Sequence, residues 1–167
     1  MSTGPAATGT LGVGPHGREL AFQRRFAEPL ETVWAAMTDS AQLVKWIGRW
    51  EGDPASGKVT FSMTAEGQDA PPEECEILQC SPPHSLTVQT GVGPALWHLR
   101  FQLGHEDGLT TLLFAQRIGD DPLGSIGPGW EYYLDRLGAM LAGEDPAQVD
   151  WDDYYAALSE HYEQLGG

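Results

Sequence analysis

The sequence has few basic residues. Nine lysines and arginines oppose 24 aspartates and glutamates among its 167 residues, which gives a formal net charge of −15. A surface of this charge repels nucleic-acid phosphates and anionic lipid headgroups. We therefore expect neither a nucleic acid nor a membrane as a partner. Only two of the nine cations are lysines, an imbalance that favours a GC-rich bacterial gene.

Long apolar runs and cysteines are scarce as well. No segment has the roughly 20 consecutive apolar residues that a membrane-spanning helix needs, and the N-terminal residues lack the basic and apolar regions of a signal peptide. The two cysteines, Cys75 and Cys80, are five positions apart, so on one strand they point to opposite faces and cannot bridge each other. These features predict a reduced, cytoplasmic protein.

Sequence motifs of known chemistry are missing too. The chain has no GxSxG, HExxH or Walker loop, and none of its five histidines has another histidine or cysteine at metal-ligand spacing. The glycines of GVGP, at 91–94, are spaced like a fragment of a nucleotide loop, but no helix follows and we interpret them as a turn. We expect no catalytic residue, no metal and no cofactor.

Hydrophobic residues make up 41% of the chain, enough for one domain with a core. We predict a flexible N-terminal tail over 1–17, a domain over 18–145 and a C-terminal helical extension over 146–167. The tail is rich in glycine, proline and small residues and contains no Asp, Glu, Lys or Arg.

Residues 19–48 have the pattern of one strand and two short helices. Apolar residues alternate over 19–26, which predicts the strand. Pro29 fits the first position of a helix, and apolar residues follow at i, i+3, i+4 and i+7, namely Leu30, Val33, Trp34 and Met37. Ser40 fits the cap of a second helix that ends at Gly48.

From residue 58 onward the period changes to alternation between apolar and polar residues. Turn-rich segments separate the alternating runs, which lie at 58–64, 74–77, 85–89, 97–103 and 109–117. This pattern predicts an antiparallel meander of five or six strands with one buried face.

Two more helices follow the meander. The first should run from about Ser125 to Ala142, roughly 27 Å, which is long enough to cross a sheet. The segment 127–129, Gly-Pro-Gly, either lets this helix move as a lid or permits tight packing, as Gly138 does. The last helix, over 151–165, is capped by Asp150, and its apolar side contains Trp151, Tyr154 or Tyr155, Leu158, Tyr162 and Leu165. The element order predicts an α+β helix-grip fold, a curved antiparallel sheet wrapped around one long helix.

Two segments of this pattern resemble a known family. The first, FQRRFAEPLETVWAAMTDSAQLVKWIG, carries Pro29, Val33, Trp34, Ala36, Thr38, Asp39, Leu43 and Trp46. The second is GWEYYLDRLGAMLAGE. Both are similar to segments of the family of homologues of the activator of the 90-kDa heat-shock-protein ATPase, within the START-related, Bet v 1-like (SRPBCC) superfamily. The resemblance covers roughly residues 19 to 143.

The resemblance implies a cavity between the long helix and the sheet. In the wider superfamily such cavities hold lipids, steroids or polyketides, and some relatives catalyse cyclisation. On this chain we expect the cavity to be lined by Phe61, Met63, Trp97, Leu99, Phe101, Phe114, Trp130, Tyr133 and Leu137. Trp97 and Trp130 should meet inside and fill much of the space, which favours a small, flat or absent ligand over a long lipid. Tyr133 is the lining residue that has a hydroxyl, so we expect it to form a hydrogen bond to a ligand.

His98 and Arg100 have two interpretations. Both alternate with the apolar residues of their strand, so they should lie on its solvated outer face. A bulge would reverse the strand and turn them into the cavity, where they would be polar groups that orient a ligand.

Three functions remain open from the sequence. The chain is either a non-enzymatic binder of a small hydrophobic or aromatic ligand, a polyketide cyclase-like or aromatase-like enzyme, or an interaction module such as a chaperone ATPase accessory. The eukaryotic activator grips its chaperone through a second domain, for which we expect no room in 167 residues. A homodimer would agree with the resemblance.

Overall fold

A computed structural model describes residues 7–14, 17–53, 56–63, 73–90, 97–118 and 123–166. Its eight strands form one antiparallel sheet in the order β1-β2-β8-β7-β6-β5-β4-β3. The strands are β1 (Thr10–Gly14), β2 (Gly17–Phe26), β3 (Gly48–Glu51), β4 (Lys58–Met63), β5 (Glu73–Ser81), β6 (Ser85–Thr90), β7 (Trp97–Glu106) and β8 (Leu109–Arg117).

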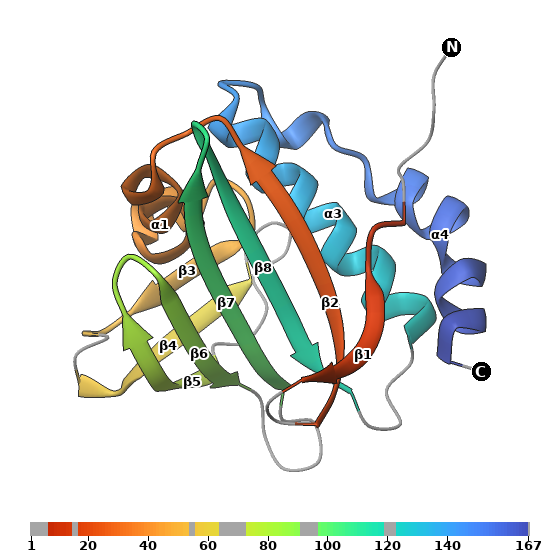
Figure 1. Cartoon of the computed structure of the whole chain (residues 1–167), viewed down its shortest axis with the longest axis horizontal. Coiled ribbons are helices and arrows are strands. Elements are labelled where there is room, and N and C mark those ends of the chain that lie inside the picture. Colours follow the sequence, from red (N-terminus) through yellow and green to blue (C-terminus); the bar gives the residue numbers. More distant parts are fainter. Residues whose placement is uncertain are drawn as a thin grey trace.

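The helices cover one face of this sheet. They are α1 (Leu30–Thr38), α2 (Ser40–Leu43), α3 (Leu123–Leu141), the 3-10 turn η3 (Pro146–Gln148) and α4 (Trp151–Gly166). Figure 1 shows the curved sheet in front of α3, with α4 beyond β1 at the side of the molecule. The predicted helix-grip, Bet v 1-like fold is confirmed. Among the described helices none is long and apolar enough to cross a membrane.

Strand β1 lies within the segment for which we predicted a flexible tail. It pairs with β2 from Thr10 opposite Ala21 to Gly14 opposite Gly17. Its sequence, TLGVG, has only two large apolar residues, too few for the alternation to be recognised. The strand forms because β2 supplies the backbone hydrogen bonds that so short a segment cannot make alone.

The sheet has one apolar face, which points toward α3. The β2–β8, β8–β7 and β7–β6 pairings run without a register shift, so residues of one parity share this inner face. Its buried apolar members on these four strands are Leu20, Phe22, Leu86, Val88, Leu99, Leu103, Leu112 and Phe114.

The two cysteines are both free, as predicted. The reason differs from the expected one, because a register shift between Ile77 and Gln79 interrupts the alternation of β5. The shift places Cys75 opposite Thr90 and Cys80 opposite Leu86. Five positions on an extended strand, at about 3.3 Å per residue, separate the two cysteines by more than a disulfide can span.

Helix α3 begins at Leu123, two residues before the predicted start, and the glycines at 127 and 129 lie inside it. A methyl group on Gly127 would stand 2.2 Å from the ring of Tyr162 in α4. Gly127 is therefore a close-packing glycine, whereas lid motion stays a prediction. Gly138 differs, because a methyl group there would meet Phe26 at an ordinary 3.6 Å.

Helix α4 packs along α3. Its predicted cap is present, since Asp150 Oδ1 accepts a hydrogen bond from the Asp152 amide at 3.0 Å. Its buried side consists of Tyr154, Leu158 and Tyr162. Of the predicted alternatives Tyr154 and Tyr155, Tyr154 is the one that lies on that side. Trp151, which was also predicted there, is 38% exposed, and Tyr155 is 48% exposed. The rings of Trp151 and Tyr155 contact each other in a tilted arrangement, with centroids 6.0 Å apart.

Candidate functional site

The residues predicted to line a cavity lie between α3 and the inner face of the sheet. Leu99, Phe114, Trp130, Tyr133 and Leu137 are buried, and the others with described side chains are half-buried: Phe61, Trp97 and Phe101. Met63 ends β4, and its side chain lies outside the described atoms. Phe61 is on β4 and is separated from β7 by two intervening strands.

Aromatic rings fill the space under α3. Trp130 lies at the centre, with ring centroids 4.4 Å from Phe114, 6.1 Å from Trp97 and 6.2 Å from Tyr133. Phe114 also contacts Phe101 at 4.8 Å. The predicted meeting of Trp97 and Trp130 is confirmed, and the tilted arrangements are those that aromatic rings prefer.

Gln116 is the polar residue of this aromatic interior. It lies on the inner face of β8, opposite Leu20 of β2 and Leu99 of β7, and it is fully buried. Its Oε1 accepts a hydrogen bond from Trp130 Nε1 at 2.6 Å. No described residue accepts a hydrogen bond from its Nε2. An unpaired buried donor costs about 1–3 kcal/mol, so the interior contains one donor that a guest molecule could satisfy.

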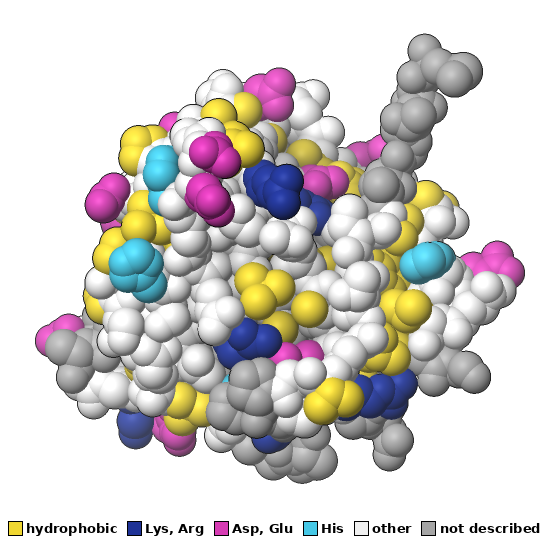
Figure 2. All heavy atoms as spheres, viewed as in Figure 1, with side chains coloured by type: hydrophobic (Ala, Val, Ile, Leu, Met, Phe, Trp, Pro, Cys, Tyr) yellow, Lys and Arg dark blue, Asp and Glu magenta, His cyan; other side chains and the backbone are white. Residues whose placement is uncertain are grey.

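His98 and Arg100 lie on the outer face of the sheet, away from α3. The pairings of β7 with both neighbours run without a shift, so no bulge turns these residues inward. They are not solvated either, because His98 is buried and Arg100 forms a two-point ion pair with Glu19. The two contacts measure 2.9 Å and 3.2 Å. Figure 2 views this face, where basic and acidic side chains adjoin near its centre.

A second polar group lies where α3, α4, β2 and the N-terminal segment meet. Its centre is Glu131 of α3, whose side chain is fully buried. The carboxylate accepts hydrogen bonds from Tyr162 Oη at 2.5 Å, Arg24 Nη2 at 2.6 Å and Thr8 Oγ1 at 2.7 Å, and also from the Thr8 amide. Tyr162 Oη in turn accepts from the Gly9 amide at 2.9 Å.

These contacts set the ionisation of the group. Burial alone would raise the pKa of Glu131, but the hydrogen bonds from Tyr162, Arg24 and Thr8 outweigh it and hold the pKa below its ordinary value. Burial and the adjacent carboxylate raise the pKa of Tyr162. At neutral pH Glu131 is therefore an ionised acceptor and Tyr162 a protonated donor, and their hydrogen bond connects α3 to α4.

Asp135, one helical turn after Glu131, extends the group toward solvent. Its carboxylate accepts a hydrogen bond from Tyr154 Oη at 2.5 Å and one from Arg24 Nη2 at 3.3 Å. Burial and this carboxylate raise the pKa of Tyr154. The charge of Arg24 is thus matched by two carboxylates, one buried and one 39% exposed.

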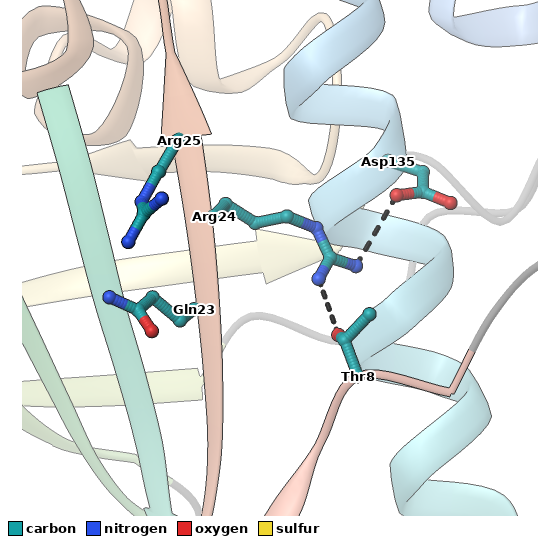
Figure 3. Close-up of a pocket in the computed structure, with 5 residues that line it drawn as sticks. All are labelled: Thr8, Gln23, Arg24, Arg25 and Asp135. Carbon is teal, nitrogen blue, oxygen red and sulfur yellow. Dashed lines mark hydrogen bonds and ion pairs between the residues drawn. The ribbon is translucent and has the colours of Figure 1, made fainter. Parts of the chain in front are cut away.

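An open pocket of about 470 Å³ lies beside this group, lined by Thr8, Gln23, Arg24, Arg25 and Asp135. Figure 3 shows Arg24 reaching from β2 toward Asp135 of α3 and toward Thr8. Gln23 and Arg25 project from the other side of the strand. This pocket lies at the edge of the sheet and shares no lining residue with the cavity predicted under α3.

Sequence reasoning missed both polar groups. Gln116 had a signal, since it continues the inner-face series of Leu112 and Phe114 as a polar residue at an apolar position. Glu131 follows Trp130 in an amphipathic helix, where a charged residue outside the apolar stripe is expected on the solvent-exposed side. The sequence therefore did not indicate that Glu131 is buried. Thr8 belongs to a segment without any periodicity.

Solved structures of low sequence identity share this fold. CalU16 from Micromonospora echinospora aligns at 24% identity with a TM-score of 0.74, over 98% of each chain. The protein encoded by gene BPP1335 from Bordetella parapertussis aligns at 24% identity with a TM-score of 0.71, over 98% of this chain and 95% of that one. EF2215 from Enterococcus faecalis, a conserved protein of unknown function, aligns at 14% identity with a TM-score of 0.68, over 94% and 91%. At these identities the likeness establishes the fold alone.

No curated protein matches the sequence. The family model described as Activator of Hsp90 ATPase homolog 1-like protein matches residues 27–142. The match begins just after β2 and ends just after α3, so it contains the helices α1, α2 and α3 of the two segments that carried the resemblance. This chain therefore belongs to the family of Activator of Hsp90 ATPase homolog 1-like proteins.

Proposed function

We propose that this protein is a non-enzymatic binder of a small aromatic or apolar molecule, held between α3 and the inner face of the sheet. The observation that carries the proposal is the unpaired, fully buried Nε2 of Gln116 beside the Trp130 ring. The ligand would be flat enough to enter between aromatic rings and would carry an acceptor oxygen or nitrogen for this amide.

The aromatic interior supports a flat ligand. Trp130 contacts Phe114 and Trp97 in tilted geometries and Tyr133 edge-on, with centroid separations between 4.4 and 6.2 Å. If the ring of a ligand entered between two of these side chains, each side chain would exchange its contact with the other for a contact with the ligand ring. Little packing energy would therefore be lost. A long lipid would need far more space than a rearrangement of these rings could provide.

The chemistry of the polar groups supports binding over catalysis. An amide such as that of Gln116 can orient a ligand but does not act as a general acid or base. Glu131, the buried carboxylate of α3, is held by four hydrogen bonds. His98 and Arg100 lie on the opposite face of the sheet, so they would not reach a ligand under α3.

Gln116→Met tests the proposal. The change keeps the volume of the side chain and removes the unpaired Nε2 donor, but it also leaves Trp130 Nε1 without its acceptor. These two effects oppose each other, so folding should change by about 1 kcal/mol or less. We expect binding of a small carbonyl-bearing bicyclic aromatic, such as 1-tetralone or a chromone, to weaken about tenfold. Affinities come from calorimetry, and the Gln116 side-chain amide signal reports contact in NMR spectra.

Trp130→Ala is the second variant, and it should weaken binding more than it weakens folding. Native mass spectrometry of the protein from its own host would reveal a bound molecule directly. Unchanged affinity in both variants, or aromatic probes that never shift the Gln116 amide, would exclude an interior binding site. Turnover of a bound molecule during these measurements would point instead to the cyclase-like alternative.

A further inference from the structure

The edge of β2 is only half covered. On one side β2 pairs with β8 from Glu19 to Phe26. On the other side β1 pairs with residues 17–21 only. Residues 22–26, about 17 Å of strand, therefore have no strand beside them within the described part of the chain.

The backbone groups of Gln23 and Arg25 point toward this open edge. In an antiparallel sheet, successive residues direct their N–H and C=O groups alternately to the two neighbouring strands. The Ile118 amide donates to the Arg18 carbonyl at 2.8 Å, so residue 18 faces β8. The even-numbered residues of β2 then bond to β8, and the odd-numbered ones face β1. At residues 23 and 25 that leaves two donors and two acceptors at the edge.

Glu131 explains why β1 stops short. The register that pairs Thr10 with Ala21 would pair Thr8 with Gln23 if the strand continued. Instead the Thr8 amide and hydroxyl both bind the Glu131 carboxylate on α3. The chain is drawn away from the sheet, and the pocket lined by Thr8 and Gln23 lies in the resulting space.

The charge at the edge is positive at one position. Arg24 is matched by Glu131 and Asp135, whereas Arg25 is exposed and has no ion pair among the described residues. A carboxylate on a neighbouring strand would find Arg25 as its cross-strand partner.

We propose that the open edge of β2 is a docking site for an extended peptide segment of a partner protein, which adds as a strand beside Gln23 and Arg25. The segment carries a carboxylate opposite Arg25, and its side chains enter the pocket next to Arg24 and Asp135. This mode of recognition uses the unpaired main-chain groups for affinity and side-chain pockets for specificity. The site is separate from the interior proposed for a small ligand.

A second copy of the chain does not suit this edge. Symmetric antiparallel pairing of two β2 edges about Arg24 would bring Arg24 and Arg25 of both copies into one ladder, where like charges repel. Each copy also has a net charge of −15, which adds long-range repulsion.

Amide hydrogen exchange tests the geometry before any ligand is added. The amides of Gln23 and Arg25 should exchange rapidly in the free protein, while those of Phe22 and Arg24 are protected by their bonds to β8. The probes are acetylated seven-residue peptides of alternating Val and Thr with a central Glu, Gln or Lys. Binding of the Glu peptides should protect Gln23 and Arg25 specifically.

Arg25→Glu should invert the peptide preference. The parent protein should bind the Glu peptides about fivefold more tightly than the Lys peptides, and the variant should prefer the Lys peptides by a similar factor. Arg49→Glu is the matched control, because Arg49 is an exposed arginine on β3, the strand at the other edge of the sheet. It should leave the preference for Glu unchanged.

Several results would overturn the proposal. Slow exchange of Gln23 and Arg25 in the free protein would mean that the edge is already paired. An unchanged preference in Arg25→Glu, or no peptide-dependent protection, would exclude strand addition. If inorganic phosphate alone protected the Arg25 amide from exchange as the Glu peptides do, the site would be a simple anion site. Concentration-dependent protection without peptide would identify a second copy as the occupant.

Discussion

Gly127 shows how a single missing methyl group decides the packing of α4. The ring of Tyr162 lies where a Cβ on Gly127 would be, and the separations to three ring atoms would be only 2.2–2.5 Å. A real Cβ at these distances would force the ring or the helix to move. Gly129, two residues later in the same helix, has nothing within 4 Å of the corresponding position.

Gly127→Ala should lower the free energy of unfolding by about 1–3 kcal/mol, the usual cost of overpacking. Gly129→Ala is the control, and it should stabilise the protein by about 0.5–1 kcal/mol because alanine loses less backbone entropy in a helix than glycine does. Urea unfolding followed by circular dichroism measures both. Equal effects of the two changes would show that Tyr162 does not pack on Gly127.

The sequence predicted that the Gly-Pro-Gly segment at 127–129 either allows the helix to move or permits tight packing. Only the structure shows that Gly127 packs tightly and Gly129 does not. The sequence presents two glycines in one helix, and helix period alone does not say which one faces another helix closely. That distinction depends on the position of α4, which is remote in the chain.

Helix α4 is an element that depends on its neighbours. Its buried side is formed by three residues, one apolar and two tyrosines that donate to carboxylates of α3. Its remaining positions are mostly exposed. A 16-residue helix of this kind is marginal on its own in water, so its stability comes from the contact with α3.

Leu158→Ala should destabilise the protein by about 2–5 kcal/mol through the loss of buried surface and the cavity left behind. Tyr155→Ala removes a larger but 48% exposed side chain and should cost less than about 1 kcal/mol. Hydrogen exchange should show the loss in Leu158→Ala mainly in α4, with β7 and β8 still protected. Uniform loss of protection across the sheet would contradict the view that α4 opens separately.

Across the whole molecule, Glu131 connects parts that are far apart in the sequence. It binds Thr8 near the N-terminus, Arg24 in β2 and Tyr162 near the C-terminus. These bonds also hold its pKa below the ordinary value. A folded state that binds fewer protons than the unfolded state gains stability with rising pH.

The fold should therefore lose stability as the pH falls from the ordinary glutamate range, about 4.3, through the lower folded pKa of Glu131. Glu131→Gln should be less stable at pH 7 by about 3 kcal/mol, because Arg24 loses its buried partner. Its unfolding free energy should also depend less on pH between about 5 and 3. Glu74→Gln is the control, since Glu74 pairs with Lys58 on the surface. Parallel pH profiles for parent and Glu131→Gln would contradict the role of this carboxylate.

The sequence by itself determined most of the elements, though not β1 or β3, and the buried face of the sheet. Alternation in the meander identified the inner-face residues of β7. Together with the apolar stripe of α3, it predicted the contact between Trp97 and Trp130. These features follow from local period, because one apolar face must be buried whatever the rest of the chain does. The same reasoning favoured the outer face for His98 and Arg100, and the unshifted pairings of β7 decided between this orientation and the inward one.

Tertiary structure alone decided the polar groups. The capture of Thr8 by Glu131, the end of β1, the unpaired amide of Gln116 and the open edge at Gln23 and Arg25 all depend on contacts between distant segments. The ion pair of Arg100 with Glu19, 81 positions away, likewise has no local signature. Hydrophobic burial repeats with the period of each element, whereas a hydrogen bond between remote residues depends on one specific arrangement of the whole fold.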